Sequence, residues 1–176
     1  MVKICVLRLG HRKIRDQRIT THVFLAARAL GAIEGVLCGE KDLPIVKTVE
    51  SVGRQWGGDF KVKYEKNWKR FLKSRKKQGW KVVHLTMYGE DFSKKTKEMD
   101  KGNWVVVVGS GKVPFELYKM VDCNLAVTNQ PHSEVAALAM FLDRVFKGRE
   151  LGLEFGGRIK IVPDKCGKVV VRGKNH

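Results

Sequence analysis

Runs of five to seven apolar residues alternate along this chain with stretches in which apolar positions recur every three or four residues. This alternation is typical of βαβ units, in which parallel strands form one sheet and helices cover its faces. We expect strands at residues 3–9, 35–39, 60–65, 81–87, 104–109 and 123–128. We expect helices at residues 20–31, 43–56, 67–78, 92–100, 114–121 and 133–148. The pattern therefore predicts an α/β fold with a mostly parallel sheet.

Two of these segments carry clear positional signals. Residues 104–109 are apolar at nearly every position, as in a strand buried on both faces, so this strand should lie at the centre of the sheet. In the last helix, Leu138 and Leu142 belong to an apolar series at three- and four-residue spacing. Ser133 and Glu134 precede that series as a helix cap and a first-turn acid.

The pattern changes after Glu150. Two short β-rich runs, RIKIV and KVVVR, flank a turn that contains proline and glycine, which predicts a terminal β-hairpin. We therefore divide the chain into one domain at residues 1–150 and a hairpin extension at residues 151–176.

The composition indicates a globular protein outside the membrane. At 176 residues the chain is long enough for one domain with its own core. The apolar runs are far shorter than the roughly 20 residues of a membrane helix, and the N-terminus begins as a strand rather than a signal peptide. We expect a cytoplasmic location. Because Cys5, Cys38, Cys123 and Cys166 are widely spaced and lack a CxxC pair, we expect neither a disulfide framework nor a metal site.

The charge balance points to a polyanionic partner. The chain has 35 Lys and Arg against 18 Asp and Glu, a net charge of +17. Residues 61–81 contain ten basic residues and one acid, and smaller basic clusters lie near both ends. Taken alone, the 61–81 run also fits a solvated helix face. The RNA contacts that we expect are Arg8, Arg12, Arg15, Lys69, Arg70, Lys73, Arg75 and Lys76.

Polar residues follow three of the predicted strands, where open α/β sheets bind their ligands. The first such stretch is RLGHRKIRDQRITTH at residues 8–22. Its Arg15, Asp16, Arg18 and His22 are chemically suited to hold a phosphate, orient one another or help remove a hydroxyl proton. The simpler alternative is a basic loop in which a threonine caps the next helix.

The other two stretches are VVGSGKVP at residues 107–114 and VTNQPHSEVAALA at residues 127–139. The glycines of the first permit tight turns and a close approach of backbone N–H groups to a ligand, although a glycine turn into a helix explains them equally well. The second has five polar side chains within residues 129–134, ahead of an amphipathic helix. That arrangement suits a polar ligand, and a capped loop without a ligand is the alternative.

These stretches carry a family resemblance. GHRKIRDQRITTH with ARALGA, then VGSGKVP, then VTNQPHSEVAALA are similar in order and content to the signature motifs of archaeal tRNA cytidine-56 2′-O-methyltransferases, a SPOUT family. The resemblance spans about residues 2–148. It implies a parallel sheet with helices on both faces and a C-terminal deep trefoil knot at about residues 81–150, one of the rare exceptions to unknotted topology. It also implies S-adenosylmethionine bound in the knot, a tRNA substrate and a homodimer whose active sites draw on both subunits.

The resemblance assigns roles to individual residues. Loops at 84–89, 109–113 and 127–134 would hold the methyl donor. The donor contacts that it implies are Leu85, Gly109, Ser110, Gly111, Lys112, Val113, Val127, Thr128, Asn129, Gln130, Pro131, His132, Ser133 and Glu134. Arg18 would engage the 2′-hydroxyl, with Asp16 and His22 as further catalytic candidates. Many ribose-methylating SPOUT enzymes begin the first motif with Asn, where this chain has Arg-Asp-Gln-Arg. Because Arg normally stays protonated, the general base remains open.

Two other functions fit part of the sequence. A non-catalytic RNA-binding protein would need the basic clusters but not the NQPHSE loop. The other alternative is a SPOUT methyltransferase that modifies an RNA base. A non-catalytic RNA-binding protein would not bind S-adenosylmethionine, which distinguishes it from an enzyme. A base methyltransferase would place the methyl group on the base rather than on the ribose. Cytidine 56 normally pairs within the folded tRNA elbow, so we expect unpairing or base extrusion during the reaction.

Overall fold

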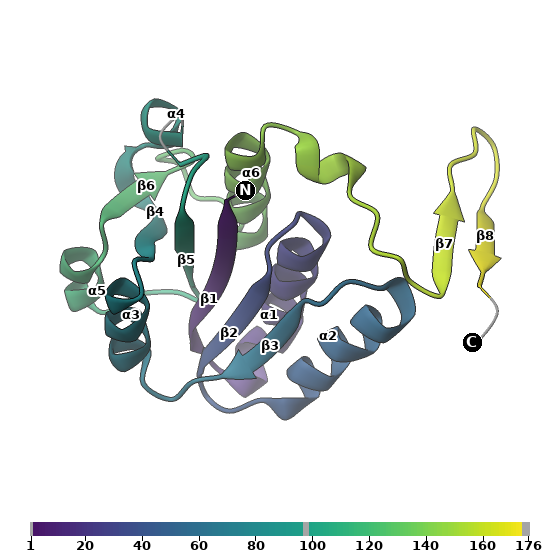
Figure 1. Cartoon of the computed structure of the whole chain (residues 1–176). Coiled ribbons are helices and arrows are strands. Elements are labelled where there is room, and N and C mark those ends of the chain that lie inside the picture. The colour runs from purple at the N-terminus through teal and green to yellow at the C-terminus, as the bar shows by residue number, and fades with distance from the viewer. Residues whose placement is uncertain (1, 97–98, 174–176) are drawn as a thin grey trace.

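The computed structural model describes residues 2–96 and 99–173, with a six-stranded sheet at its centre (Figure 1). The strand order is β3-β2-β1-β5-β4-β6 and every neighbouring pair is parallel. The strands are β1 (Lys3–His11), β2 (Glu34–Gly39), β3 (Lys61–Tyr64), β4 (Lys81–Asp91), β5 (Asn103–Gly109) and β6 (Cys123–Ala126). The predicted α/β fold with a mostly parallel sheet is confirmed.

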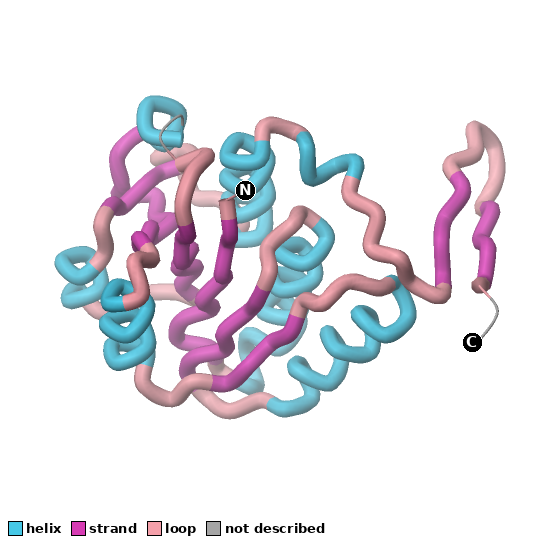
Figure 2. Tube along the Cα trace, viewed as in Figure 1, coloured by secondary structure: helices cyan, strands magenta, loops and turns pink. Residues whose placement is uncertain are grey.

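Helices cover both faces of this sheet, as the tube in Figure 2 shows. The helices are α1 (Lys13–Ala29), α2 (Leu43–Trp56), α3 (Trp68–Lys77), α4 (Phe92–Lys95), α5 (Phe115–Met120) and α6 (Glu134–Phe146), followed by a 3₁₀ turn, η2 (Arg149–Gly152). One core cluster joins the sheet to α1, α2 and α6, and a second joins it to α3 and α5. Two apolar layers therefore sandwich the sheet.

Strand β5 lies between β1 and β4, so its predicted central place is confirmed. Its side chains alternate between the two layers. Val106 and Val108 belong to the cluster with α1 and α6, and Val105 and Val107 to the cluster with α3 and α5. All four valines are at most 2% exposed, which explains why the strand is apolar at nearly every position.

Helix α1 begins at Lys13, seven residues before residue 20, so the predicted helix start was wrong and the alternative of a basic loop across this segment is excluded. The first two turns have no apolar period because they lie on the surface, where even Ile14 is fully exposed. Asp16 starts the helix by accepting a hydrogen bond from the backbone N–H of Arg12, as in a capping box. The threonine expected as a cap lies inside the helix.

The segment between β4 and β5 also differs from its prediction as a helix over residues 92–100. Strand β4 continues to Asp91, and α4 is one short turn capped by the Asp91 side chain, which accepts from the N–H of Ser93. Residues 97–98 lie outside the described part of the chain. Residues 92–100 contain too few apolar positions for a longer helix to bury a face.

The C-terminal extension ends in the hairpin that the sequence predicted. Strands β7 (Ile159–Val162) and β8 (Val169–Arg172) pair antiparallel and project away from the sheet (Figure 1). An isolated bridge between Gly57 and Gly156 ties the preceding segment to the end of α2. The division at residue 150 as a domain boundary remains a prediction.

Candidate functional site

The carboxyl ends of β1, β4, β5 and β6 meet at one edge of the sheet, because these strands are parallel neighbours. The polar stretches that follow β1, β5 and β6 start at this edge, and the 86–89 segment of β4 lies beside them. The fold therefore brings together segments that are separated by up to 126 residues, as the contact between Arg8 and Glu134 shows.

Arg8 joins the first and third stretches. Its side chain is fully buried, and its Nη1 donates to the carbonyl oxygen of Gly109 at 2.6 Å. Both terminal nitrogens lie 3.4 Å from Oε1 of Glu134. Burial lowers the pKa of Arg8, and the Glu134 carboxylate acts in the opposite direction. We expected Arg8 on the RNA-contacting surface, but a buried guanidinium cannot reach RNA, so this expectation was wrong.

A buried chain of polar groups continues from Arg8 to Asp42. Arg8 Nε donates to the hydroxyl of Thr20 at 3.2 Å, and His11 Nδ1 lies 3.0 Å from the same oxygen. His11 Nε2 lies 3.2 Å from Asp42 Oδ2. These contacts link Arg8, Thr20, His11 and Asp42 into one continuous hydrogen-bonded network.

The buried polar network from Arg8 to Asp42 was not predicted from the sequence. His11 and Thr20 lie inside the first polar stretch, but they were not singled out, and Asp42 is 31 residues from His11. The one usable signal was Arg8 itself, since a charged residue within an otherwise apolar strand pattern must find buried partners.

The 84–89 segment lies inside β4 rather than in the expected loop, and it touches the 127–134 loop directly. The side-chain amide of Asn129 donates to the carbonyl oxygens of Met87 at 2.6 Å and Gly89 at 3.4 Å. Leu85 is buried and pairs in register with Leu125 of β6. The 84–89 segment and the 127–134 loop are therefore held in a fixed position relative to each other.

The 109–113 loop leaves the edge close to the first turns of α1. A Cβ atom placed on Gly109 would lie 2.5 Å from the side chain of Val113, so the turn requires glycine there. A Cβ on Gly111 would lie 3.6 Å and 3.9 Å from the guanidinium groups of Arg12 and Arg15. Ser110 ties this loop to β1, because its N–H donates to Leu9 and its hydroxyl to Gly10.

The 127–134 loop presents polar groups to solvent ahead of α6. The four residues from Thr128 to Pro131 are exposed, as is Lys112 across the edge. His132 Nδ1 lies 2.7 Å from the carbonyl oxygen of Gln130, and Ser133 caps α6 by accepting from the N–H of Val135. The predicted cap is confirmed. Of the remaining members of the loop, Val127 and Glu134 are half-buried.

Asp16 is poorly suited to accept a proton. It is 3% exposed and accepts from the backbone N–H and the Nε of Arg12, while Arg15 Nε lies 3.5 Å from its other oxygen. Burial alone would raise the pKa of Asp16, but the hydrogen bonds and charges of Arg12 and Arg15 lower it overall. A carboxylate held in this way orients arginines better than it removes protons.

Arg18 and His22 lie on another flank of α1. Both are exposed and line a shallow hollow of about 350 Å³ between α1 and α2, with Pro44 and Thr48 opposite. Within one chain, Arg12 and Arg15 come within 4 Å of a Cβ placed on Gly111, and Arg18 does not.

The basic side chains of α3 are largely engaged. Lys69 pairs with Glu116, Arg70 with Glu65 and Lys76 with Asp122. Arg75 pairs with Glu34 and stacks on the rings of Phe71 and Trp80, and its side chain is only 15% exposed. Lys73 is exposed and has no carboxylate within ion-pair distance in residues 2–96 and 99–173.

A family model described as tRNA ribose 2′-O-methyltransferase, aTrm56, matches residues 56–171, which is more than half of the chain. The chain belongs to the aTrm56 family. A relative from Methanopyrus kandleri is 50% identical over 169 residues, covering 95% of each chain. Relatives from Methanocaldococcus jannaschii and Pyrococcus horikoshii are each 49% identical, over 97% and 98% of this chain and 97% and 87% of their own. All three are named tRNA (cytidine(56)-2′-O)-methyltransferase.

Solved structures of RNA-modifying enzymes share the fold of this aTrm56 chain. The A. aeolicus TrmH/SpoU tRNA modifying enzyme superposes with a TM-score of 0.63 at 13% identity, covering 88% of this chain and 79% of its own. The SpoU methyltransferase AviRb from Streptomyces viridochromogenes, solved with the cofactor AdoMet, gives 0.62 at 13% identity, with 86% and 61% covered. At this identity the likeness establishes the fold only.

Residues 2–96 and 99–173 contain no group of three or more His, Cys, Asp or Glu arranged to hold a metal ion. None of the helices in that part of the chain is long and apolar enough to cross a membrane.

Proposed function

We propose that this chain is a cytoplasmic S-adenosylmethionine-dependent enzyme that methylates the ribose 2′-oxygen of cytidine 56 in tRNA. The observation that carries the proposal is the identity of about 50% over nearly the whole chain to several relatives named for that reaction. The polar stretches, their shared sheet edge and the +17 charge are all consistent with it.

The residues at the sheet edge fit the proposed donor. Gly109 and Gly111 keep the turn after β5 free of side chains, and Thr128, Asn129 and Gln130 expose hydroxyl and amide groups suited to a nucleoside and an amino-acid moiety. When bound, S-adenosylmethionine supplies a methyl carbon that is already activated by its positively charged sulfur. The chain's own residues then have to bind the donor and align the ribose oxygen.

A trefoil knot at about residues 81–150, within a domain of residues 1–150, is part of this proposal. Leu125 of β6 pairs with Leu85 of β4 and again with Glu90 of β4. The intervening residues 86–89 of β4 therefore bulge away from β6 before the pairing resumes. A Cβ atom on Gly89 would lie 2.6 Å from the backbone of Asn124, so two chain segments pass there in backbone contact. Such close passage is what a threaded loop requires.

A homodimer would complete the site. Arg18, which we assign to the reacting ribose, lies between α1 and α2 and away from the 109–113 loop of its own chain. A second subunit would bring its Arg18 to these loops. The fully exposed Ile14 on α1 and the half-exposed Met140 on α6 offer apolar surface for that contact.

The proposed roles in the reaction follow from charge and exposure. Arg18, with His22 nearby, faces solvent and can hold a phosphate or the ribose 2′-oxygen. Asp16 would position Arg12 and Arg15 rather than take the proton, because its pKa is lowered. His22 is the remaining candidate for the proton acceptor among the three residues. Fixing the 2′-oxygen in line with the methyl carbon would supply most of the acceleration.

The deciding experiment uses an unmodified tRNA transcript, the purified protein and S-adenosylmethionine. We expect one new site of resistance to alkaline cleavage, at position 56. A matched transcript with 2′-deoxycytidine at position 56 should accept no methyl group. Methylation recovered on the cytosine base would instead identify a base methyltransferase, and tRNA binding without donor binding would identify a non-catalytic RNA-binding protein.

A further inference from the structure

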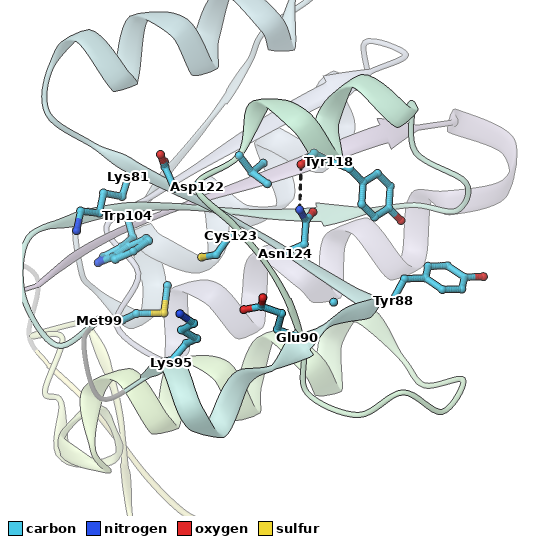
Figure 3. Close-up of a pocket in the computed structure, with 12 residues that line it drawn as sticks. Lys81, Tyr88, Glu90, Lys95, Met99, Trp104, Tyr118, Asp122, Cys123 and Asn124 are labelled. Atoms are coloured by element: carbon cyan, nitrogen blue, oxygen red, sulfur yellow. Dashed lines mark hydrogen bonds between the residues drawn. The ribbon is translucent and has the colours of Figure 1, made fainter.

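Two neighbouring rings, Phe115 and Tyr118, and the Tyr88 side chain, which lines the same hollow as Tyr118, lie at the proposed donor loops, and we call these three residues the aromatic platform. Phe115 and Tyr88 are 71% and 77% exposed. The rings of Phe115 and Tyr118 lie 6.2 Å apart with 30° between their planes. Tyr88 and Tyr118 lie at the same end of a hollow of about 800 Å³, opposite Trp104 (Figure 3).

The platform is anchored from behind by polar contacts. The Tyr118 hydroxyl lies 3.2 Å from Oγ1 of Thr86, which also accepts from the N–H of Tyr88 at 3.4 Å. His84 meets the Tyr118 ring edge-on at 4.9 Å. Tyr118 is therefore fixed in orientation, and it supports Phe115.

Folding alone does not account for the exposed rings. Helix α5 buries only Leu117 in the core, so the sheet is covered without Phe115. A single exposed apolar residue is ordinary, but clustered exposed aromatic rings next to a ligand-binding edge mark an interaction surface. Phe115 follows the 109–113 loop by two residues, which places the platform at that edge.

The charges around the platform indicate an anionic partner. Lys119 Nζ lies 5.0 Å from the centre of the Phe115 ring, and Lys112 is exposed in the preceding loop. The neighbouring acid, Glu116, is paired with Lys69 of α3, which links the platform to the basic helix. Flat rings bordered by cations match a nucleobase and its phosphates better than an apolar protein surface.

We propose that the aromatic platform stacks against one unpaired base of the tRNA elbow. The proposal rests on the proposed function, because delivering the ribose of a base-paired nucleotide to the donor separates that base pair. A base that loses its partner also loses stacking, and an aromatic ring replaces that contact regardless of which base it is. Phe115 and Tyr88 would touch the base, and Tyr118 is a positioning residue.

The test measures tRNA affinity, its salt dependence and donor affinity for four variants. Phe115→Ala and Tyr88→Ala should each weaken tRNA binding about tenfold at every salt concentration. Their salt slopes should stay unchanged, because a ring releases no counterions, whereas Lys119→Ala should lower the slope by about one. Phe115→Trp should restore affinity. Donor affinity should stay at the parent value in Phe115→Ala, Phe115→Trp and Lys119→Ala, whose positions lie outside the proposed donor loops.

Leu151→Ala is the matched control, because Leu151 is 73% exposed and aliphatic and lies in η2 rather than in the platform. It should bind tRNA like the parent. If Phe115→Ala binds tRNA with the parental affinity, the proposal is overturned. If that variant also changes its oligomeric state, the platform belongs to a protein–protein contact instead. If the parent fails to methylate cytidine 56 while Phe115→Ala still weakens tRNA binding, the proposed function fails and the platform stands.

Discussion

The guanidinium of Arg8 and the carboxylate of Glu134 face each other at 3.4 Å across 126 residues of sequence. Arg8 is fully buried, while the Glu134 side chain is 35% exposed. The pair therefore ties β1 to the start of α6. The proposed donor loop at residues 127–134 leads directly into that end of α6. It fixes the relative position of two motifs that must act together.

Arg8→Met should lower the free energy of unfolding by about 3 kcal/mol, because it leaves the Gly109 carbonyl and the Thr20 hydroxyl without their donor. Glu134→Gln should cost only about 1 kcal/mol, since water already screens this carboxylate. Urea unfolding of both variants and of the double variant measures their coupling. Additive losses would show that the two side chains do not stabilise one another.

Arg18→Lys should lower the single-turnover methylation rate by about two orders of magnitude or more, because the planar fork of the guanidinium is lost while its charge is kept. Donor affinity measured by calorimetry should barely change. Asp16→Asn is the comparison, and we expect a smaller loss from it. A near-normal rate in Arg18→Lys with collapse in His22→Ala would move the catalytic assignment to His22.

Lys73→Ala should reduce the slope of the logarithm of tRNA affinity against the logarithm of salt concentration by about one. The reason is that Lys73 is exposed and forms no ion pair with a carboxylate of the described residues. Arg75→Ala should leave that slope unchanged and lower the free energy of unfolding by about 1–2 kcal/mol, since its pairing with Glu34 and stacking on Trp80 are lost. The reverse result would assign Arg75 to the RNA surface.

The stability of the protein should fall on acidification through the titration of His84. Burial lowers the pKa of His84 from 6.5, against a hydrogen bond with Asn124 at 3.0 Å. The unfolded chain therefore takes up a proton below pH 6.5 that the folded chain resists, so stability is retained above this pH and lost below it. In urea unfolding at several pH values, His84→Gln should lose less stability between pH 6.5 and 5 than the parent does.

Gly109→Val should abolish donor binding, because its side chain would collide with Val113 and distort the turn that holds the 109–113 loop. Gly152→Val is a matched control, since a Cβ at Gly152 meets nothing within 4 Å. Calorimetry with S-adenosylmethionine checks both. Unchanged affinity in Gly109→Val would remove this loop from the donor site.

The spacing of apolar residues predicted correctly those helices and strands that bury one face in the core. Helix α2 spans the residues 43–56 that were expected, because one of its faces is apolar and buries Ile45 and Val49. The first two turns of α1 escaped prediction because they touch little of the core. Their cap is formed by Asp16, which lies four residues into the helix rather than before it.

The meeting of the three polar stretches was predictable because parallel strands deliver their carboxyl ends to one edge. The buried polar network from Arg8 through Thr20 and His11 to Asp42 was not, because its members come from three different places, β1, α1 and the start of α2, and have no common spacing. The knot and the dimer likewise follow from no local pattern, and they enter only through the family resemblance.

The β7–β8 ribbon has a consequence for solubility. Residues 169–171 are consecutive valines, each 44–50% exposed, on a strand that pairs with β7 alone in the described part of the chain. An open edge with this composition is a template for edge-to-edge aggregation. Lys168 and Arg172 bracket the valines, so two copies aligned at this edge would bring like charges together. The bracketing cations allow the extension to stay exposed while the protein remains dispersed.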